Sequence, residues 1–252
     1  MSDLPSVANR EVAAGSARLP RRLVAGLFDA SAEHYDRICR VMSFGTGQTY
    51  RRDALTRAGL QPGMRLLDVA TGTGLMVREA MAILGDESLV LGVDPSAGML
   101  REARQVRYRV VRGLGEALPF QSRRFDFLCM GYALRHLDDL HETFSEYLRV
   151  LSPGGRLVLL EITPPDSRVG SWLTRQYFQH AVPLMTRVVT RNSASEHLMR
   201  YYWDTIAQFV PPADVVSSLR ESGFVDVARN VVHGIFSEYV GRKRSVSDSP
   251  HH

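Results

Sequence analysis

The central part of the chain alternates short apolar runs with segments whose apolar residues recur at helical spacing. Short apolar runs bounded by turn residues are typical of buried strands, whereas a 3.6-residue period is typical of helices. The runs predict five strands, over residues 65–70, 89–94, 108–112, 125–130 and 156–162. Helical spacing follows the first strand over residues 75–84. We therefore expect parallel strands joined by right-handed helical crossovers.

Helical patterns also lie on both sides of this core. Residues 20–62 contain two of them and predict a cap that folds over the sheet. Residues 164–210 predict a helical insertion after the fifth strand. Its first helix, over residues 169–188, is amphipathic and should bend at Pro183. A second helix is expected over residues 194–209.

The two ends of the chain complete the predicted organisation. The segment after the insertion predicts one helix and two closing strands, over residues 213–222, 224–230 and 234–241. Residues 1–19 are polar and without a period, which indicates a mobile arm. Residues 244–252 predict a flexible tail. We therefore expect one domain over residues 20–243.

A glycine turn joins the first strand to the first helix, and its sequence is Thr71-Gly72-Thr73-Gly74. Gly72 and Gly74 have no Cβ, so the backbone can turn sharply and approach a ligand closely. The turn leads into a helix N-terminus, whose unpaired N–H groups can face that ligand. Asp94 ends the second strand, where a carboxylate can accept hydrogen bonds from both hydroxyls of a ribose. This unit predicts a site for an adenosine-containing cofactor.

The type of cofactor follows from what the turn lacks. A dinucleotide fingerprint needs a third glycine three residues after Gly74, where this chain has Val77. No lysine follows the turn, which excludes a phosphate-binding P-loop. A glycine turn without pyrophosphate features, followed by a ribose-binding acid, suits S-adenosylmethionine. The structural alternative is that the glycines serve only the geometry of the sheet, and Asp94 favours the cofactor.

Composition narrows the class of protein further. The 252 residues are 44% hydrophobic, enough to bury a full core, and Lys243 is the only lysine beside many arginines. This use of arginine indicates genome composition rather than a nucleic-acid footprint, and no basic run with interleaved aromatic residues predicts nucleic-acid binding. No apolar run has the length of a membrane span or the form of a signal peptide. We expect a cytoplasmic protein with at most peripheral membrane contact.

Metal and disulfide chemistry are not expected. The two cysteines, Cys39 and Cys129, have neither metal-ligand nor redox spacing and should be reduced core thiols. No cluster of histidine and acidic residues has the spacing of metal ligands.

A set of short motifs is distributed between about Phe28 and Lys243. They are Phe28-Asp29 with Tyr35-Asp36, Met42-Ser43-Phe44-Gly45, Glu116-Ala117-Leu118-Pro119-Phe120, Leu134-Arg135, Leu151-Ser152-Pro153-Gly154-Gly155-Arg156, and residues 234–243. Together these residues resemble the ubiquinone/menaquinone C-methyltransferases, a class I S-adenosylmethionine-dependent family. The resemblance implies an α/β, doubly wound, Rossmann-like sheet of seven mostly parallel strands in the order 3-2-1-4-5-7-6.

The resemblance also implies where S-adenosylmethionine binds. Its implied contacts are Tyr35, Arg51, Asp68, Ala70, Gly72, Thr73, Gly74, Asp94, Pro95, Met99, Leu114, Gly115, Glu116 and Gly131. Among them, Tyr35 and either Arg51 or Arg52 should close over the methionine end of the cofactor.

The chain departs from the family pattern at three places. Leu114 stands where the family usually has Asn or Asp, which accepts a hydrogen bond from the adenine amino group. Gly115 and Glu116 must replace that contact, or adenine is held by packing. His136 stands where the family has Asn, and residues 192–195 replace an acidic segment. The acceptor side therefore differs from the family more than the cofactor side does.

The expected reaction is methylation of a hydroxylated aromatic or quinol-like small molecule, at carbon first and at oxygen or nitrogen second. A ring carbon becomes nucleophilic when a neighbouring hydroxyl loses its proton. Arg135 can stabilise the resulting phenolate, His136 can take the proton, and His180 is a second candidate base. The residues that can line a flat aromatic pocket are Phe44, Tyr132, Tyr177 and Phe178.

Each candidate also has a structural alternative. Arg135 can bridge the sheet edge to the insertion, and Glu161 can pin the loop after the fifth strand. His136 can be a surface residue, His180 a neighbour of the core, and Tyr35 ordinary packing of the cap. Core or dimer-surface positions are expected for Trp172, Tyr201, Tyr202 and Trp203.

Two other functions remain open. One is an enzyme of a natural-product pathway that methylates oxygen or nitrogen or has altered cofactor chemistry. The other is a cofactor-binding homologue that does not methylate and serves a partner. A homodimer is compatible with all three functions.

Overall fold

A seven-stranded sheet in the order β3-β2-β1-β4-β5-β7-β6 forms the centre of the protein. The computed structural model describes residues 21–248 except 191–197, 200, 204 and 207–208. The strands are β1 Leu66–Val69, β2 Val90–Asp94, β3 Arg109–Arg112, β4 Phe125–Gly131, β5 Leu151–Ile162, β6 Val225–Val232 and β7 Phe236–Arg242. Pairs from β3 to β5 are parallel, and β7 is antiparallel to both of its neighbours. The predicted fold class and strand order are confirmed.

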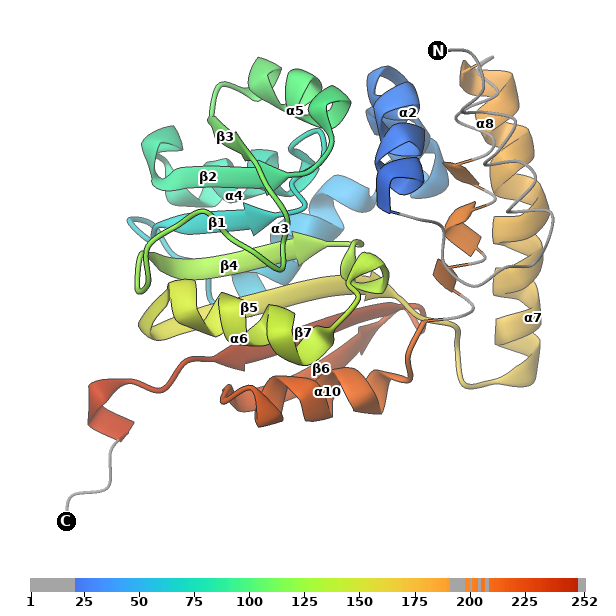
Figure 1. Cartoon of the computed structure of the whole chain (residues 1–252). Helices are drawn as coiled ribbons and strands as arrows, with labels where there is room; N and C mark the ends of the chain where they lie inside the picture. Colours follow the sequence, from blue (N-terminus) through green and yellow to red (C-terminus); the bar gives the residue numbers. More distant parts are fainter. Residues whose placement is uncertain (1–20, 191–197, 200, 204, 207–208, 249–252) are drawn as a thin grey trace.

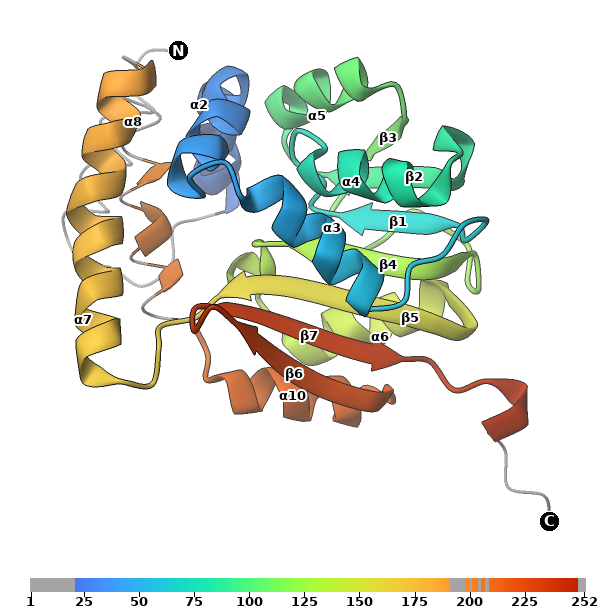
Figure 2. The same ribbon diagram turned by 180° about the vertical axis from the view of Figure 1, so that it is seen from behind.

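Helices cover both faces of this sheet. They are α2 Arg21–Met42, α3 Gly47–Arg57, α4 Leu75–Leu84, α5 Ala97–Ala103, α6 Leu140–Val150, α7 Arg168–Gln176, α8 Val182–Thr190 and α10 Pro212–Glu221. Figures 1 and 2 show α6 and α10 on one face and α3 and α4 on the other. The predicted arm over residues 1–19, residues 192–195 and the last four residues lie outside the described part of the chain.

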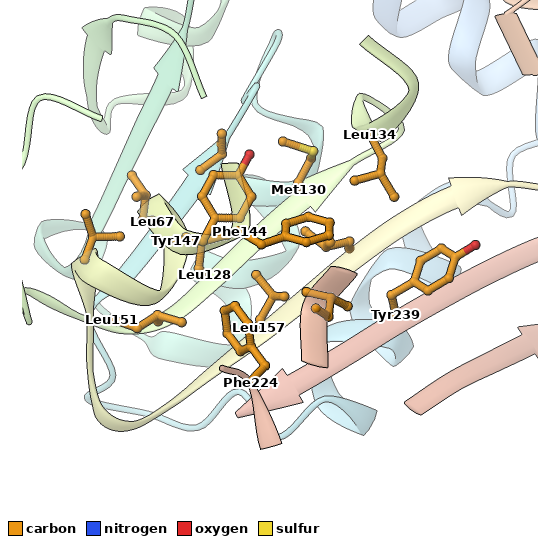
Figure 3. Close-up of a cluster of buried hydrophobic side chains, with 14 of the residues drawn as sticks. Leu67, Leu128, Met130, Leu134, Phe144, Tyr147, Leu151, Leu157, Phe224 and Tyr239 are labelled. Carbon is orange, nitrogen blue, oxygen red and sulfur yellow. The ribbon is translucent and has the colours of Figure 1, made fainter. Parts of the chain in front are cut away.

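The alternation of side chains along β1 explains why both faces are covered. Leu67 and Val69 belong to the apolar cluster under α6 and α10, whereas Leu66 belongs to the cluster under α3 and α4. Figure 3 shows Phe144 and Tyr147 of α6 among the strand residues of the first cluster. Full burial of one such side chain stabilises the fold by about 1.5–3 kcal/mol. A strand that is apolar on both faces must lie in the middle of the sheet, which places the ends of β1, β2 and β4 at its centre.

The fifth strand is longer than predicted. The sequence predicted a start at Arg156, after a helix-breaking Ser-Pro-Gly-Gly segment, but β5 begins at Leu151, which pairs with Phe125. The same segment also bonds to the chain leaving β7, because Gly154 N–H donates to the Lys243 carbonyl and Lys243 N–H donates to Gly155. Long-range pairing therefore makes strand out of residues with turn propensity.

Lys243 holds this corner of the molecule together. Its Nζ donates to the carbonyl oxygens of Leu148 and Leu151, at 2.7 and 2.8 Å. These groups end α6, where carbonyls have no intrahelical partner and a cation is favourable. Burial lowers the pKa of this ammonium group.

The insertion begins with a rod of two helices. A π-helical turn, Tyr177–Ala181, separates α7 from α8, immediately before Pro183. Proline removes a backbone donor from a helix interior, and a π turn is one way to absorb that defect. The sequence predicted a bend at Pro183, and the structure has a wider turn that precedes the proline.

The first described helix, α2, is longer than the sequence indicated and extends to Met42. It contacts α5 along one side and α8 along the other. Figures 1 and 2 show it between these two helices, above the carboxyl ends of the strands. Within the ranges that the structure describes, no helix is both long and apolar enough to cross a membrane.

Candidate active site

A cavity lies at the carboxyl ends of β1, β2 and β4, and we call it the strand-end cavity. It encloses about 1190 Å³ of space, part of it open to solvent. Its sheet side contains Ala70, Gly72, Asp94 and Gly131. The other side includes residues of α2 and of the insertion, namely Val24, Phe28, Tyr35, Tyr201, Tyr202 and Thr205. Ligands of open α/β sheets bind in this position.

Asp94 connects the glycine turn to the start of α5. Its two carboxylate oxygens accept hydrogen bonds from Gly72 N–H and Ser96 N–H, both at 2.8 Å. Burial raises the pKa of Asp94 to about 6, and the two backbone hydrogen bonds oppose that shift. Each oxygen keeps a second lone pair, and the residue lines the cavity. The site therefore fits a ribose with two hydroxyl donors.

The buried carboxylate of Asp68, in β1, stabilises the glycine turn. Asp68 accepts from Thr71 Oγ1 at 2.7 Å and from the Cys129 thiol at 3.3 Å. Burial raises the pKa of Asp68 to about 7. Gly72 has a φ of +56°, and a Cβ at this position would project into open space. The open space beside the turn is what a closely bound ligand requires.

Two acids of α2 attach the cap to the cavity rim. Asp29 accepts from the Ser96 hydroxyl and from Gly98 N–H, at the start of α5. A side chain at position 98 would meet the Asp29 backbone at 2.8 Å, so this approach requires glycine. About two helical turns further along α2, Asp36 accepts from the Thr73 hydroxyl and forms an ion pair with Arg78 of α4. The cap is therefore hydrogen-bonded both to the start of α5, after Asp94, and to the glycine turn.

Two strand ends have strained backbones. Ala70 follows β1 with a φ of +55°, and Tyr132 follows β4 with a φ of +61°. Such conformations are unfavourable for residues with a Cβ and persist only where the surrounding structure enforces them. Because β1 and β4 are neighbours, the two residues lie at adjacent positions of the sheet edge.

The charged pair Arg135–Glu161 is fully buried next to this edge. Arg135 Nη1 lies 2.7 Å from Glu161 Oε1 and also donates to the Tyr132 carbonyl. Its Nε donates to Thr205, and the guanidinium lies 4.2 Å from the Tyr202 ring centre. Burial opposes the charge, but Glu161 and the surrounding tyrosines raise the pKa of Arg135 overall. Its Nη2 is buried and has no hydrogen-bond partner among the described residues.

His136 lies on the same cavity wall. Its Nδ1 is 3.1 Å from the Tyr201 hydroxyl, and its ring is stacked on Tyr201 and meets Phe28 edge-on. The histidine is therefore oriented by aromatic neighbours from the cap and from the insertion. It is a partly buried cavity residue, which differs from the alternative of a plain surface position.

A second cavity of about 1170 Å³ lies beside the first, between α2, α3, the insertion and the β6–β7 turn. We call it the aromatic cavity. Its aromatic lining consists of Tyr35, Tyr50, Tyr132, Tyr177, Phe178, Tyr202 and Phe236. The polar exceptions include Arg51, whose guanidinium lies 5.7 Å from the Tyr132 ring centre.

Three tyrosines line both cavities, and we call Tyr35, Tyr132 and Tyr202 the tyrosine wall. The hydroxyls of Tyr35 and Tyr202 are 2.6 Å apart. Burial raises the pKa of all three phenols, so their hydroxyls remain protonated at neutral pH. They can donate hydrogen bonds to a ligand on either side, and they cannot act as bases there.

Most of the predicted cofactor residues come together in the strand-end cavity. These are Tyr35, Ala70, Gly72, Asp94, Pro95, Met99, Leu114, Gly115, Glu116 and Gly131. Asp68, Thr73 and Gly74 do not line it and instead shape the turn. Arg51 lines the aromatic cavity, and Arg52 forms an ion pair with Glu79 of α4.

The predicted acceptor-side residues are more dispersed. Tyr132, Tyr177 and Phe178 line the aromatic cavity. Phe44 lines neither cavity and is exposed, and the same is true of His180. Among the described residues, no group of three His, Cys, Asp or Glu side chains is arranged to hold a metal ion.

Comparison with known proteins identifies the family. A family model described as the ubiE/COQ5 methyltransferase family matches residues 14–243. The chain belongs to this family. It is similar to a ubiquinone/menaquinone biosynthesis C-methyltransferase UbiE of Shewanella halifaxensis, with 31% identity over 88% of this chain and 90% of the relative. A demethylmenaquinone methyltransferase of Deinococcus radiodurans is 33% identical over 88% of this chain and 92% of the relative.

Solved structures share the fold at lower sequence identity. A methyltransferase of Thermotoga maritima, described as a possible histamine N-methyltransferase, has a TM-score of 0.62 and 20% identity over 87% of this chain and 99% of its own. Phosphoethanolamine N-methyltransferase 2 of Haemonchus contortus, solved with S-adenosylmethionine, has a TM-score of 0.60 and 16% identity over 86% and 57%. The chain is an S-adenosylmethionine-dependent methyltransferase, as its motifs predicted.

Sequence reasoning missed several residues of the site. Asp29 and Asp36 were named only as parts of short motifs, without a role in the site. Helix α5 and its N-cap residue Ser96 were not predicted. Tyr201 and Tyr202 were expected in the core or at a dimer surface, and they are core residues that also line the strand-end cavity. A serine before a short helical segment is a usable N-cap signal, as at Ser96, but nothing local marks the tyrosines.

Proposed function

We propose that the protein methylates a ring carbon of a hydroxylated aromatic, quinol-like acceptor. The names of the relatives support this class of acceptor, since they act on menaquinone and ubiquinone precursors. The observation that carries the proposal is Arg135, a fully buried cation in the cavity wall with one Nη donor left unpaired. An unpaired buried donor is costly unless a ligand completes it.

The cofactor half of the site has a clear division of work. Asp94 accepts from the ribose hydroxyls, and the Gly72 turn allows close approach to the sulfur end. Met99 and Leu114 pack against adenine, which replaces the polar contact that the family usually makes there. Tyr35 covers the cavity from α2, and the Gly131 backbone forms its sheet side. When bound, S-adenosylmethionine supplies an electrophilic methyl group carried on a positively charged sulfur.

Arg135 and His136 act on the acceptor. His136 removes the proton of a ring hydroxyl, which leaves the oxygen negatively charged and makes the adjacent ring carbon nucleophilic. That carbon takes the methyl group as the methyl–sulfur bond breaks, and it then loses its own hydrogen as a proton, which restores the aromatic ring and the hydroxyl. Arg135 Nη2 donates to that oxygen and stabilises the charge, while Glu161 and Thr205 hold the guanidinium in place. Because the three phenols of the tyrosine wall stay protonated, they do not compete with His136 as the base. The wall also excludes water from the reacting atoms.

The test is an analysis of products. Purified protein is incubated with S-adenosylmethionine and a panel of naphthoquinols and benzoquinols that lack one ring methyl. We expect a gain of one methyl by mass spectrometry and a new carbon-bound methyl signal by NMR. In Arg135→Lys we expect turnover to fall about a hundredfold or more, with unchanged affinity for S-adenosylmethionine. A methyl ether or a methylamine as the product would reject carbon methylation.

A second candidate function is methylation of oxygen or nitrogen in a natural-product pathway. The observation that favours it is the altered acceptor side, where His136 replaces the asparagine of the family. The same product analysis decides between the two, because an oxygen-bound methyl resonates at a different chemical shift. Binding of S-adenosylmethionine without turnover of any acceptor would instead support a non-methylating homologue.

A further inference from the structure

The outer side of the insertion rod exposes a row of large apolar side chains. Eight large hydrophobic residues are exposed in the described part of the chain, and five of them lie on α7 and α8. They are Val169, Trp172, Leu173, Leu184 and Val188, and each exposes between 55% and 71% of its surface. Figures 1 and 2 show α7 and α8 end to end along one edge of the molecule. A contiguous apolar patch of this kind marks an interaction surface.

The π turn brings the two halves of this row into line. In an uninterrupted α-helix, Val188 would be rotated from Val169 by about 100° around the axis. The π turn Tyr177–Ala181 accommodates one extra residue and so takes back about 100°. The inner side of the rod, with Phe178, Val182 and Thr186, is buried against the rest of the protein. We call the aligned outer row the α7–α8 face.

Positive charge borders this face. Arg168, Arg175 and Arg187 are exposed, and the same helical geometry places them along one flank of the row. Residues 168–190 contain no aspartate or glutamate. An apolar stripe with Trp and Leu, flanked by arginines and free of acids, is the pattern of a helix that lies in a membrane interface.

Phe44 extends the apolar surface beyond the rod. It lies in the turn between α2 and α3 with 76% of its surface exposed, and its ring centre is 6.0 Å from that of Tyr177. Its φ of +48° is unfavourable for a residue with a Cβ. A strained turn that presents an exposed aromatic ring beside the rod is consistent with an apolar contact partner.

We propose that the α7–α8 face, together with Phe44, docks on the surface of an anionic lipid bilayer. Anionic headgroups complement the three arginines, and the apolar row reaches the acyl boundary. A second copy of the chain fits less well. In an antiparallel two-fold interface, the arginine flanks of both copies would meet in one contact, with no acid on either rod to pair with them.

The docking face lies on the outer side of a wall of the aromatic cavity. Tyr177 and Phe178 line that cavity from the π turn, and the Tyr177 hydroxyl donates to the Met42 carbonyl at 2.7 Å. An apolar acceptor dissolved in the bilayer therefore has a short path to the cavity, a step that rests on the proposed function. Docking itself depends only on the surface.

Vesicle binding tests the proposal with the full chain and without cofactor or acceptor. The protein is sedimented with vesicles of phosphatidylcholine and phosphatidylglycerol, and with vesicles of phosphatidylcholine alone. We expect binding to the anionic vesicles, and at least a tenfold loss in the double variant Trp172→Gln/Leu173→Gln. The triple variant Arg168→Gln/Arg175→Gln/Arg187→Gln should lose binding to a similar extent. Added salt should weaken the binding of the wild-type protein to anionic vesicles.

A matched pair of variants controls for general changes in surface polarity. Val188→Gln changes the α7–α8 face and should weaken vesicle binding several-fold. Val231→Gln changes an exposed valine of β6 outside that face and should bind like the wild type. The chain has two tryptophans, so the blue shift of fluorescence on binding should disappear in Trp172→Phe, which keeps the apolar character.

Two outcomes would overturn the proposal. One is wild-type protein that does not bind anionic vesicles, or face variants that bind as well as Val231→Gln. The other is a concentration-dependent dimer in analytical ultracentrifugation that Trp172→Gln/Leu173→Gln dissociates, because the face would then join two copies. Neither outcome bears on methyl transfer, which is measured with a water-soluble quinol, so the two proposals fail separately.

Discussion

The sheet side of the strand-end cavity is formed by strand ends and a backbone turn, whereas the aromatic cavity is lined mainly by side chains of helices and of the closing hairpin. In the first, buried carboxylates hold backbone N–H groups at fixed positions, as Asp94 does at Gly72 and Ser96. In the second, rings from six separate parts of the chain meet. The first cavity can be specific for one cofactor through its backbone. The shape of the second cavity depends on its aromatic side chains, so the exchange of one ring alters the ligand that it fits.

The two cavities meet at the tyrosine wall, and the largest expected effect lies beside it, at Arg135, whose guanidinium contacts the Tyr202 ring. Arg135→Met leaves the Glu161 carboxylate buried and unpaired, so the free energy of unfolding should fall by about 3–5 kcal/mol. Denaturant unfolding measures this loss. The double variant Arg135→Met/Glu161→Met should recover most of the stability and none of the turnover. If the double variant loses as much free energy of unfolding as the two single variants lose together, Arg135 and Glu161 are not coupled.

Asp94 should make cofactor binding sensitive to pH. Its raised pKa, about 6, means that the cofactor-free protein holds a proton on this carboxyl at mildly acidic pH. Ribose hydroxyls donate to the ionised form, so affinity should fall by up to about tenfold per pH unit below 6. Calorimetry between pH 5 and 8 measures this slope.

The same carboxyl has the opposite effect on folding. Its stabilising contribution is present below the unfolded pKa of about 3.9 and is lost as pH rises through about 6. Asp94→Asn should bind S-adenosylmethionine at least about tenfold more weakly, a loss of about 1.4 kcal/mol, and without the pH slope. Asp68→Asn is the control, since burial also raises the Asp68 pKa, to about 7. If the affinity of Asp94→Asn for S-adenosylmethionine still depends on pH, the proton that controls binding belongs to another group.

The attachment of the cap should have a smaller effect. Asp29→Ala removes the acceptor for the Ser96 hydroxyl and for Gly98 N–H, and should lower stability by about 1–2 kcal/mol. Affinity for S-adenosylmethionine should fall several-fold, because Ser96 also positions Asp94. Asp86→Ala is a matched control, since Asp86 caps an exposed 3₁₀ turn through Ser88 N–H. Equal effects on affinity in both variants would show that the cap does not position the site.

The smallest expected effect is at Leu114. Leu114→Asn restores a side-chain acceptor beside the position expected for adenine and should raise affinity about threefold or more, within the range of one hydrogen bond. Leu114→Ala should lower affinity, because it removes the packing surface. Isothermal titration of both variants against S-adenosylmethionine gives the comparison. Weaker binding in Leu114→Asn than in Leu114→Ala would indicate that adenine lies elsewhere.

The sequence predicted the sheet and the cofactor motif because both depend on local signals. Apolar runs marked β1 and β2, and Gly72 with Asp94 marked the turn and the acid that ends β2. The start of β5 was wrong, since pairing with β4 and with the chain after β7 overrides the Pro-Gly-Gly segment. The Tyr35–Tyr202 contact joins residues 167 positions apart. No local pattern in either segment indicates the other, which is why Tyr35 and Tyr132 were predicted as site residues but their union with Tyr202 was not.

The two candidate bases, His136 and His180, also differ in whether local sequence could predict their positions. His136 follows a strand, and the edge of an α/β sheet is where ligands bind, so its position in the cavity could be predicted. His180 was proposed because it lies on the insertion helix, but helical phase alone could not place it. The π turn shifts the phase at that residue, and His180 is exposed instead of directed inward.

A chain with one lysine gives amine-reactive reagents a single side-chain target. Lys243 Nζ is engaged with two carbonyls at the end of α6, where the closing hairpin meets the helix. Acylation of that nitrogen requires the release of both hydrogen bonds. The rate of labelling at Lys243, followed by peptide mass spectrometry, therefore measures how often these contacts with the end of α6 open in the native protein, without any engineered probe.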